Sequence, residues 1–141
     1  MFHPFLPDPT VFAFPALAQN VTKDFELVQA LDVSSYKTGA FFLRLHAGAF
    51  PSGNANLVVT IEAQKIWPGE LRDPLFNIIS IPSFLVSAPV NPNTLNGDLL
   101  EMAQTTLNAP ALRIFVRFTA SGGATNAGNI TLSAGILLLA S

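Results

Sequence analysis

Apolar and polar residues alternate with a period of two along most of the chain, which is the spacing of a strand buried on one face. Every second residue is apolar in the clearest of these segments, which are residues 41–46, 57–64, 112–119 and 130–138. Gly, Pro, Asn and Ser residues, which favour turns, separate the segments. Because no segment of ordinary helical length shows the 3.6-residue period, the chain is predicted to be all-β.

Three further segments are candidates for secondary structure. Residues 25–31 read as a strand, and residues 74–86 contain one or two strands broken at Pro82. Residues 98–107 fit a short helix or a strand equally well, and a loop rich in Asn and Pro precedes them. Seven or eight short strands joined by frequent turns indicate a sandwich or a barrel, and we expect a jelly-roll-type double-sheet sandwich.

The first 20 residues differ from the rest because they mix Phe with Pro, which excludes a helix and favours extended backbone. The sequence therefore divides into an extended arm, residues 1–20, and a single β-sandwich domain, residues 21–141. An apolar arm must lie on its own domain or on a neighbouring molecule, and the pattern leaves both open. The arm contributes four candidate interface residues, Phe2, Phe5, Phe12 and Phe14.

Charge is the unusual feature of the composition. Asp, Glu, Lys and Arg make up 11% of the chain, where about 25% is typical. A surface with so few charges tends to carry large apolar patches, which mark interfaces, so a homodimer or homotrimer is expected. The net charge is −2 and the seven Lys and Arg residues are scattered, so nucleic acid is not an expected partner.

No membrane span or cleaved leader is expected. The apolar run at residues 134–140 is too short to cross a bilayer. Residues 11–18 imitate a signal peptide, but no Lys or Arg precedes them and Pro15 interrupts them.

The sequence offers little for catalysis, a metal or a cofactor, and none of these is expected. Cys is absent, and the two histidines, His3 and His46, lack the spacing of a zinc site. The Gly-rich segment at 123–128 lacks the Lys-Ser/Thr of a phosphate-binding loop and fits a hairpin turn better. Carboxylate pairs such as Glu70 and Asp73 fall in loops, where solvated acids are common. A small cupin-like enzyme is disfavoured for these reasons.

Two aromatic residues outside the arm are further interface candidates. Trp67 closes a predicted strand, where a lone Trp serves as a core residue or an interface anchor. Phe115 lies between Arg113 and Arg117 on one strand face. Two arginines are too few for a nucleic-acid stripe, so a protein contact or cross-strand pairing is expected there.

Residues 25–39 (FELVQALDVSSYKTG), residues 109–114 (APALRI) and the Gly-rich hairpin before the last strand resemble small virion proteins of tailed bacteriophages. The chain looks like a capsid decoration, or cement, protein, and the resemblance covers residues 22–140. It implies a jelly roll, homo-oligomerisation, and attachment to the outer surface of the capsid, across subunits of the major capsid protein. No functional residue carries over, because such proteins have no catalytic motif.

The expected function is therefore that of a structural virion protein rather than an enzyme. The alternative is a carbohydrate-binding β-sandwich module, as in adhesion proteins. It needs a groove with several exposed aromatic side chains, and Trp67, Tyr36 and scattered Phe residues are the available candidates.

Overall fold

The structure is a computed structural model, and it describes residues 2–5, 10–49, 55–86, 99–120, 124 and 127–140. Most of the described residues lie in strands, and the helical element among them is a short 3-10 turn, η1, Pro68–Glu70. The strands are β1 Phe2–Pro4, β2 Thr10–Phe14, β3 Thr22–Asp32, β4 Thr38–Ala49, β5 Ala55–Trp67, β6 Leu71–Arg72, β7 Phe76–Val86, β8 Leu99–Thr106, β9 Ala111–Ala120 and β10 Gly128–Leu139.

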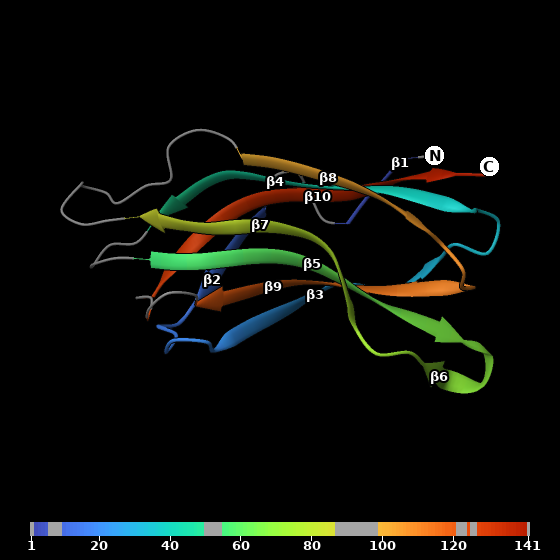
Figure 1. The fold of residues 1–141 in the computed structure, drawn as a ribbon, viewed down its shortest axis with the longest axis horizontal. Coiled ribbons are helices and arrows are strands. Elements are labelled where there is room, and N and C mark those ends of the chain that lie inside the picture. Colours follow the sequence, from blue (N-terminus) through green and yellow to red (C-terminus); the bar gives the residue numbers. More distant parts are fainter. Residues whose placement is uncertain are drawn as a thin grey trace.

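The strands form two antiparallel sheets that pack face to face (Figure 1). The first sheet has the order β1-β10-β4-β8, and β2 pairs with the same strand, β10, farther along. The second sheet has the order β3-β9-β5-β6, and β7 also pairs with β5. Each sheet buries one face, which is why the strands alternate between apolar and polar residues.

The order of pairing defines a jelly roll. Pairs are nested along the chain: β2 with β10, β3 with β9, β4 with β8 and β5 with β7. The chain is thus one long hairpin of four strand pairs, rolled up so that alternate pairs fall in opposite sheets. This is the eight-strand, double-Greek-key arrangement of jelly rolls, and it confirms the predicted fold class.

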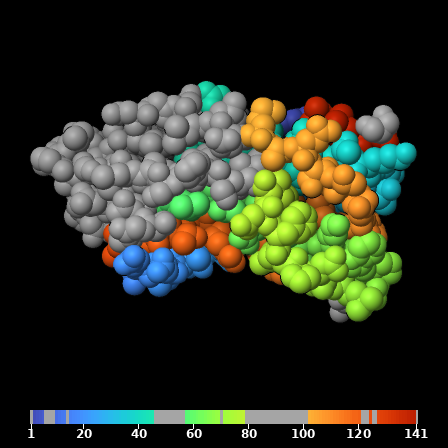
Figure 2. Space-filling model, viewed as in Figure 1, coloured from blue at the N-terminus to red at the C-terminus, as the bar shows by residue number. Residues whose placement is uncertain are grey.

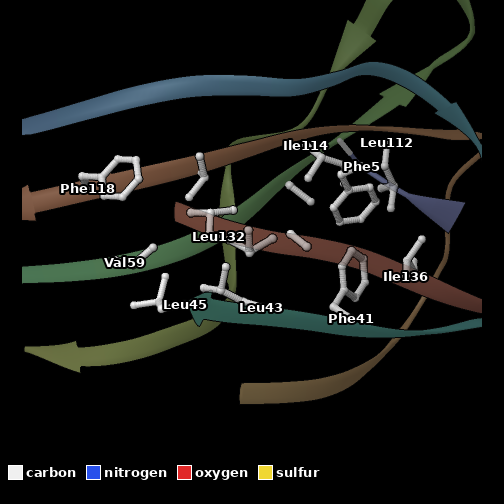
Figure 3. Close-up of a cluster of buried hydrophobic side chains, with 14 of the residues drawn as sticks. Phe5, Phe41, Leu43, Leu45, Val59, Leu112, Ile114, Phe118, Leu132 and Ile136 are labelled. Atoms are coloured by element: carbon white, nitrogen blue, oxygen red, sulfur yellow. The ribbon is translucent and has the colours of Figure 1, made fainter. Parts of the chain in front are cut away.

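Residues of the inner faces fill the space between the sheets (Figure 3). On β9, Leu112, Ile114, Val116 and Phe118 alternate strictly with half-buried residues, as the sequence pattern predicted. They meet β4 and β10 side chains such as Phe41 and Leu132 from the opposite sheet. Burying each such side chain contributes about 1.5–3 kcal/mol, so this layer supplies most of the driving force for folding.

The N-terminal segment lies against its own chain. Both β1 and β2 pair with the same edge of β10. The backbone N–H of Phe5 donates to the Ala134 carbonyl at 2.9 Å, and the Phe5 ring packs in the core at 6.0 Å from the Phe41 ring. The Phe12 ring lies 5.0 Å from Phe25 and 6.1 Å from Phe118, measured between ring centroids. Residues of the arm therefore complete the first sheet and part of the core.

Two segments that the sequence left open are resolved as strands. Residues 99–106 form β8, an edge strand of the first sheet, rather than a helix. The β7 strand continues through Pro82, because its pairing with β5 shifts register between Leu57 and Val59, opposite that position. Such a bulge on an edge strand accommodates a residue that has no N–H to donate. Residues 51–54, which separate two of the predicted strands, the Asn- and Pro-rich loop before residues 98–107 and most of the Gly-rich hairpin lie outside the described residues.

Candidate functional site

The outer face of the first sheet carries an apolar surface built from four strands. Cross-strand register places Phe2 opposite Leu137 and Leu137 opposite Ala40. In the next row, Gly135 lies opposite both Pro4 and Phe42, while Met102 is paired with Phe42 from its other side. We call this surface the Phe2 patch, and it consists of Phe2, Pro4, Ala40, Phe42, Met102, Gly135 and Leu137.

Solvent reaches the large side chains of the Phe2 patch. The exposed fractions are 52% for Phe2, 43% for Leu137 and 65% for Met102, values high for residues of this kind. The Phe2 and Phe42 rings stack, with centroids 5.4 Å apart and an interplanar angle of 20°. Gly135 leaves room for this arrangement, because a Cβ built there would lie 2.8 Å from Cε1 of the Phe42 ring. The patch therefore presents two stacked aromatic rings at its centre.

Charge is nearly absent from this face. Among the described side chains of the outer face of the first sheet, Arg44 is the one charged group, two residues beyond Phe42 on β4. The other neighbours are small or neutral, such as Gln104, Thr106 and Ser133. An exposed apolar surface with an uncharged surround is typical of a protein–protein contact.

A second exposed apolar surface lies on the hairpin formed by the end of β5, η1 and β6. Trp67 pairs directly with Leu71, so their side chains share one face of the hairpin. Leu71 is 67% exposed, and Leu75, in the connection that leads from β6 to β7, is 39% exposed. We call these three residues, Trp67, Leu71 and Leu75, the Trp67 tip. The hairpin stands out from the sandwich, at the end of the molecule where both chain termini lie (Figure 1), and its residues form a convex corner (Figure 2).

Local structure holds the Trp67 tip in place. Gly69 adopts a positive φ of 78°, a conformation that a residue with a side chain rarely takes. The Asp73 N–H donates to the Lys65 carbonyl at 3.1 Å, and Lys65 Nζ lies 5.9 Å from the Phe76 ring centroid. These contacts restrict the conformations of the hairpin and so lower the entropy lost on docking, which favours its use as a contact.

The outer face of the second sheet has the opposite character, because it carries an ionic network. Arg117 binds the Asp24 carboxylate through two hydrogen bonds of 2.7 and 3.0 Å, and its Nη1 lies 3.0 Å from Oε1 of Glu62. Arg113 pairs with Glu26 and lies over the Phe115 ring, 4.6 Å from the ring centroid. Both arginines are thus neutralised within the chain, and the Arg113–Phe115–Arg117 stripe offers no free positive charge to a polyanion.

Glu62 is the buried member of this network. Its side chain is 4% exposed, and its Oε2 atom has no hydrogen-bond partner among the described residues. Burial raises the pKa of the Glu62 carboxyl above its ordinary value of 4.5, and the attraction of Arg117 offsets only part of that effect. The pKa of Arg117 is itself raised, first by its hydrogen bond to Asp24.

The six interface candidates from the sequence fall in different environments. Phe2 belongs to the Phe2 patch and Trp67 to the half-buried base of the tip, whereas Phe5 is 6% exposed and lies in the core. Phe12 packs against the core, and Phe115 is half-buried beneath Arg113. The side chain of Phe14 lies outside the described residues. The structure therefore does not bring the six together into one surface.

Sequence reasoning missed most of the Phe2 patch. Phe42, Met102 and Leu137 come from three strands that are distant along the chain, and each looks ordinary in its own strand. A signal existed at Phe42, which is a large apolar residue on the more polar face of its strand, between Ala40 and Arg44.

No pocket is found in the part of the chain that the structure describes, nor any group of three His, Asp or Glu side chains able to hold a metal ion. His3 is half-buried near Phe5, and the His46 side chain lies outside the described residues. Within those residues, no helix is both long and apolar enough to cross a membrane. The carbohydrate-binding alternative gains no support, because the described surface shows no groove lined by aromatic rings.

Comparison with solved structures places this jelly roll among folds found in virus particles. A structure of infectious bursal disease virus, Gx strain, matches 92% of this chain with a TM-score of 0.55 and 11% sequence identity. A subviral particle of the same virus, formed by its VP2 protein, matches 94% of the chain with 12% identity and a TM-score of 0.40. The chain spans only about a third of each solved chain, 31% and 33% respectively.

No protein-family model matches the chain, and a search of curated proteins also gives no match. At 11% identity, the first of the two structures establishes a shared fold and nothing finer. The comparison therefore supports the jelly-roll fold, which a chain of that virus shares, and it does not reach the decoration proteins of tailed phages.

Proposed function

We propose that this chain is a structural protein of a virus particle and not an enzyme. The observation that carries the proposal is the pair of exposed apolar surfaces, the Phe2 patch and the Trp67 tip, on a jelly roll that carries few charges and gathers its described ion pairs on the outer face of the second sheet. Apolar surfaces of this kind become stable when neighbouring subunits cover them. The fold shared with a chain of infectious bursal disease virus supports the same conclusion.

In its finer form, the proposal is a decoration (cement) protein on the outer surface of the capsid, bound across subunits of the major capsid protein. A closed shell repeats the same seam many times, so contacts that are weak singly add up when copies also contact one another. The low charge of the chain, 11% Asp, Glu, Lys and Arg, suits a protein whose surface is mostly covered in an assembly.

The test is the copy number of the chain in purified particles of the virus that encodes it. Quantitative mass spectrometry should find the chain at a fixed, high ratio to the main shell protein across gradient fractions. Its absence from particles would overturn the proposal.

A second measurement separates decoration from shell building. Mild denaturant should strip the chain and leave closed shells with a lower melting temperature, and adding the purified protein back should restore it. Shells that fall apart into subunits when the chain is lost would instead indicate a shell-forming protein and contradict the finer proposal.

A further inference from the structure

Two apolar surfaces remain uncovered on the described part of the chain, and they differ in shape. The Phe2 patch lies on the face of a sheet, where the Phe42 ring lies across Gly135 and stacks with the Phe2 ring. The Trp67 tip is convex and belongs to the second sheet. Leu71 and Met102 are the most exposed large apolar residues of the two surfaces, at 67% and 65%. Because both surfaces expose large apolar side chains, we look for a contact that covers both of them.

Contact between two Phe2 patches is the simplest alternative, but the area is too small. Four strands by about five residues cover roughly 300 Å², given the spacing of strands and residues in a sheet. Two such faces bury about 600 Å² together, whereas a stable specific interface needs roughly 1,000 Å² or more. This arrangement would also leave Leu71 and Leu75 exposed.

From these surfaces we infer that the Trp67 tip of one copy of this chain docks on the Phe2 patch of another copy. Each copy then donates one tip and offers one patch, so it takes part in two contacts and the area buried per copy doubles. Because the two surfaces are different, the contact is heterologous: it closes into a reciprocal dimer or a ring where the rotation between copies allows closure, and otherwise continues from copy to copy as an open chain. No exposed surface of the patch or tip is left without a partner.

Charge agrees with this pairing. The patch contains no charged side chain, and the described charged group nearest to it on the same face is Arg44. In the tip, the three contact side chains are apolar, and Arg72 pairs with Ile66, so alternation along β6 places it on the other face of the hairpin from Trp67 and Leu71. Docking centred on these apolar side chains buries mainly apolar area and limits the cost of stripping water from an unpaired charge, which amounts to several kcal/mol.

This contact deepens the proposed function, because it describes how neighbouring copies meet on a shell. It is tested on the isolated protein, so that its failure leaves the copy number in virions as a separate question.

The absence of cysteine from the sequence allows a direct test by disulfide trapping. Leu71→Cys and Met102→Cys are made as separate variants, each at an exposed position, and are mixed at micromolar concentration under mild oxidation. The mixture should give a disulfide-linked dimer of one variant with the other. Its yield should exceed that of a mixture of Leu71→Cys with Val11→Cys by about tenfold or more, since docking raises the local thiol concentration.

Val11 is a matched control because it is 60% exposed and lies on the same sheet, on β2 rather than in the patch. A linked dimer that forms from Met102→Cys alone as readily as from the mixture would indicate patch-to-patch contact and overturn the inference. Equal yields with the Val11 variant would overturn it as well.

Light scattering on a sizing column gives an independent readout. The wild-type chain should elute as a species larger than its 15.0 kDa monomer, whereas Leu71→Asp and Met102→Asp should each elute as monomers. Near-native circular dichroism of both variants is the check that they are folded. A wild-type chain that stays monomeric across micromolar concentrations, together with no trapping above the Val11 control, would rule out the contact.

Discussion

The Phe42 ring lies across Gly135 of the neighbouring strand, and the two residues are direct partners in the ladder between β4 and β10. Any side chain at position 135 would meet both the ring and the His3 carbonyl oxygen, which would lie 3.0 Å from a Cβ there. The glycine is thus required by the close approach of an aromatic ring on the surface of the sheet, and it makes room for the Phe42 ring that stacks with Phe2.

Gly135→Ala should lower the free energy of unfolding by about 1–3 kcal/mol, because the added methyl group displaces the Phe42 ring or the β1 backbone. Urea denaturation monitored by circular dichroism measures the change. In a Phe42→Ala background the same substitution should cost much less, because the ring is gone. Equal costs in both backgrounds would mean that the ring is not the obstacle.

Phe5→Ala should destabilise the protein by about 3–5 kcal/mol, since it leaves a cavity between the sheets beside Phe41. Thermal or urea unfolding at low protein concentration is the measurement. Val11→Ala, in the same N-terminal segment but 60% exposed, is the control and should stay within about 0.5 kcal/mol of wild type. If Phe5→Ala were silent in the isolated chain, the N-terminal segment would have to dock on another molecule instead.

Arg117→Met should be much more damaging than Arg113→Met. Removing Arg117 leaves the Glu62 carboxylate buried without its ion-pair partner, a loss that typically costs about 3–5 kcal/mol. Arg113 pairs with Glu26 at the surface, where both side chains are about a third exposed, and such pairs contribute about 0–1 kcal/mol. Comparable losses of stability in the two variants would contradict the importance assigned to burial of Glu62.

Glu62→Gln should change the dependence of stability on pH. Burial raises the pKa of Glu62 in the folded protein, so the folded state holds this proton more tightly than the unfolded state does. The contribution of Glu62 is therefore fully present below pH 4.5 and is lost as the pH rises through the higher folded-state pKa. Relative to wild type, the Gln variant should become more stable as the pH rises from 4 to 7.

Melting temperatures measured across that range test the prediction, with Glu26→Gln as the control at the exposed pair. A constant difference between Glu62→Gln and wild type at all pH values would show that burial does not govern the titration of Glu62.

Alternation within single strands was enough to predict the fold class. In β5 and β9, each apolar residue of the pattern, such as Ile61 or Val116, is buried between the sheets. Edge strands were harder to predict from the sequence, because each of them pairs with only one neighbouring strand. The segment that became β8 shows no clear alternation, with Met102 pointing out to solvent while Ala103 packs against the core.

The Phe2 patch was beyond sequence reasoning for a different reason. It depends on the register of four strands, and register is set by pairings between distant parts of the chain. The same limit applied to Phe5, whose place in the core follows from its hydrogen bond to Ala134 and not from any local pattern. Glu62 alternates with the buried residues of its strand, which is the pattern of a solvent-facing residue. The sequence of β5 alone does not indicate that Arg117 of β9 forms an ion pair with it.

The nesting of strand pairs has a consequence for how the protein matures. Phe2 and Leu137 face each other although almost the whole described chain separates them, so their side of the patch can form only after β10 has joined the first sheet. Closing so long a loop is slow compared with forming local hairpins such as β5 and β7. A nascent or partly folded chain would lack a complete docking surface. Only fully folded molecules would then be able to dock, so partly folded molecules would not enter a growing assembly.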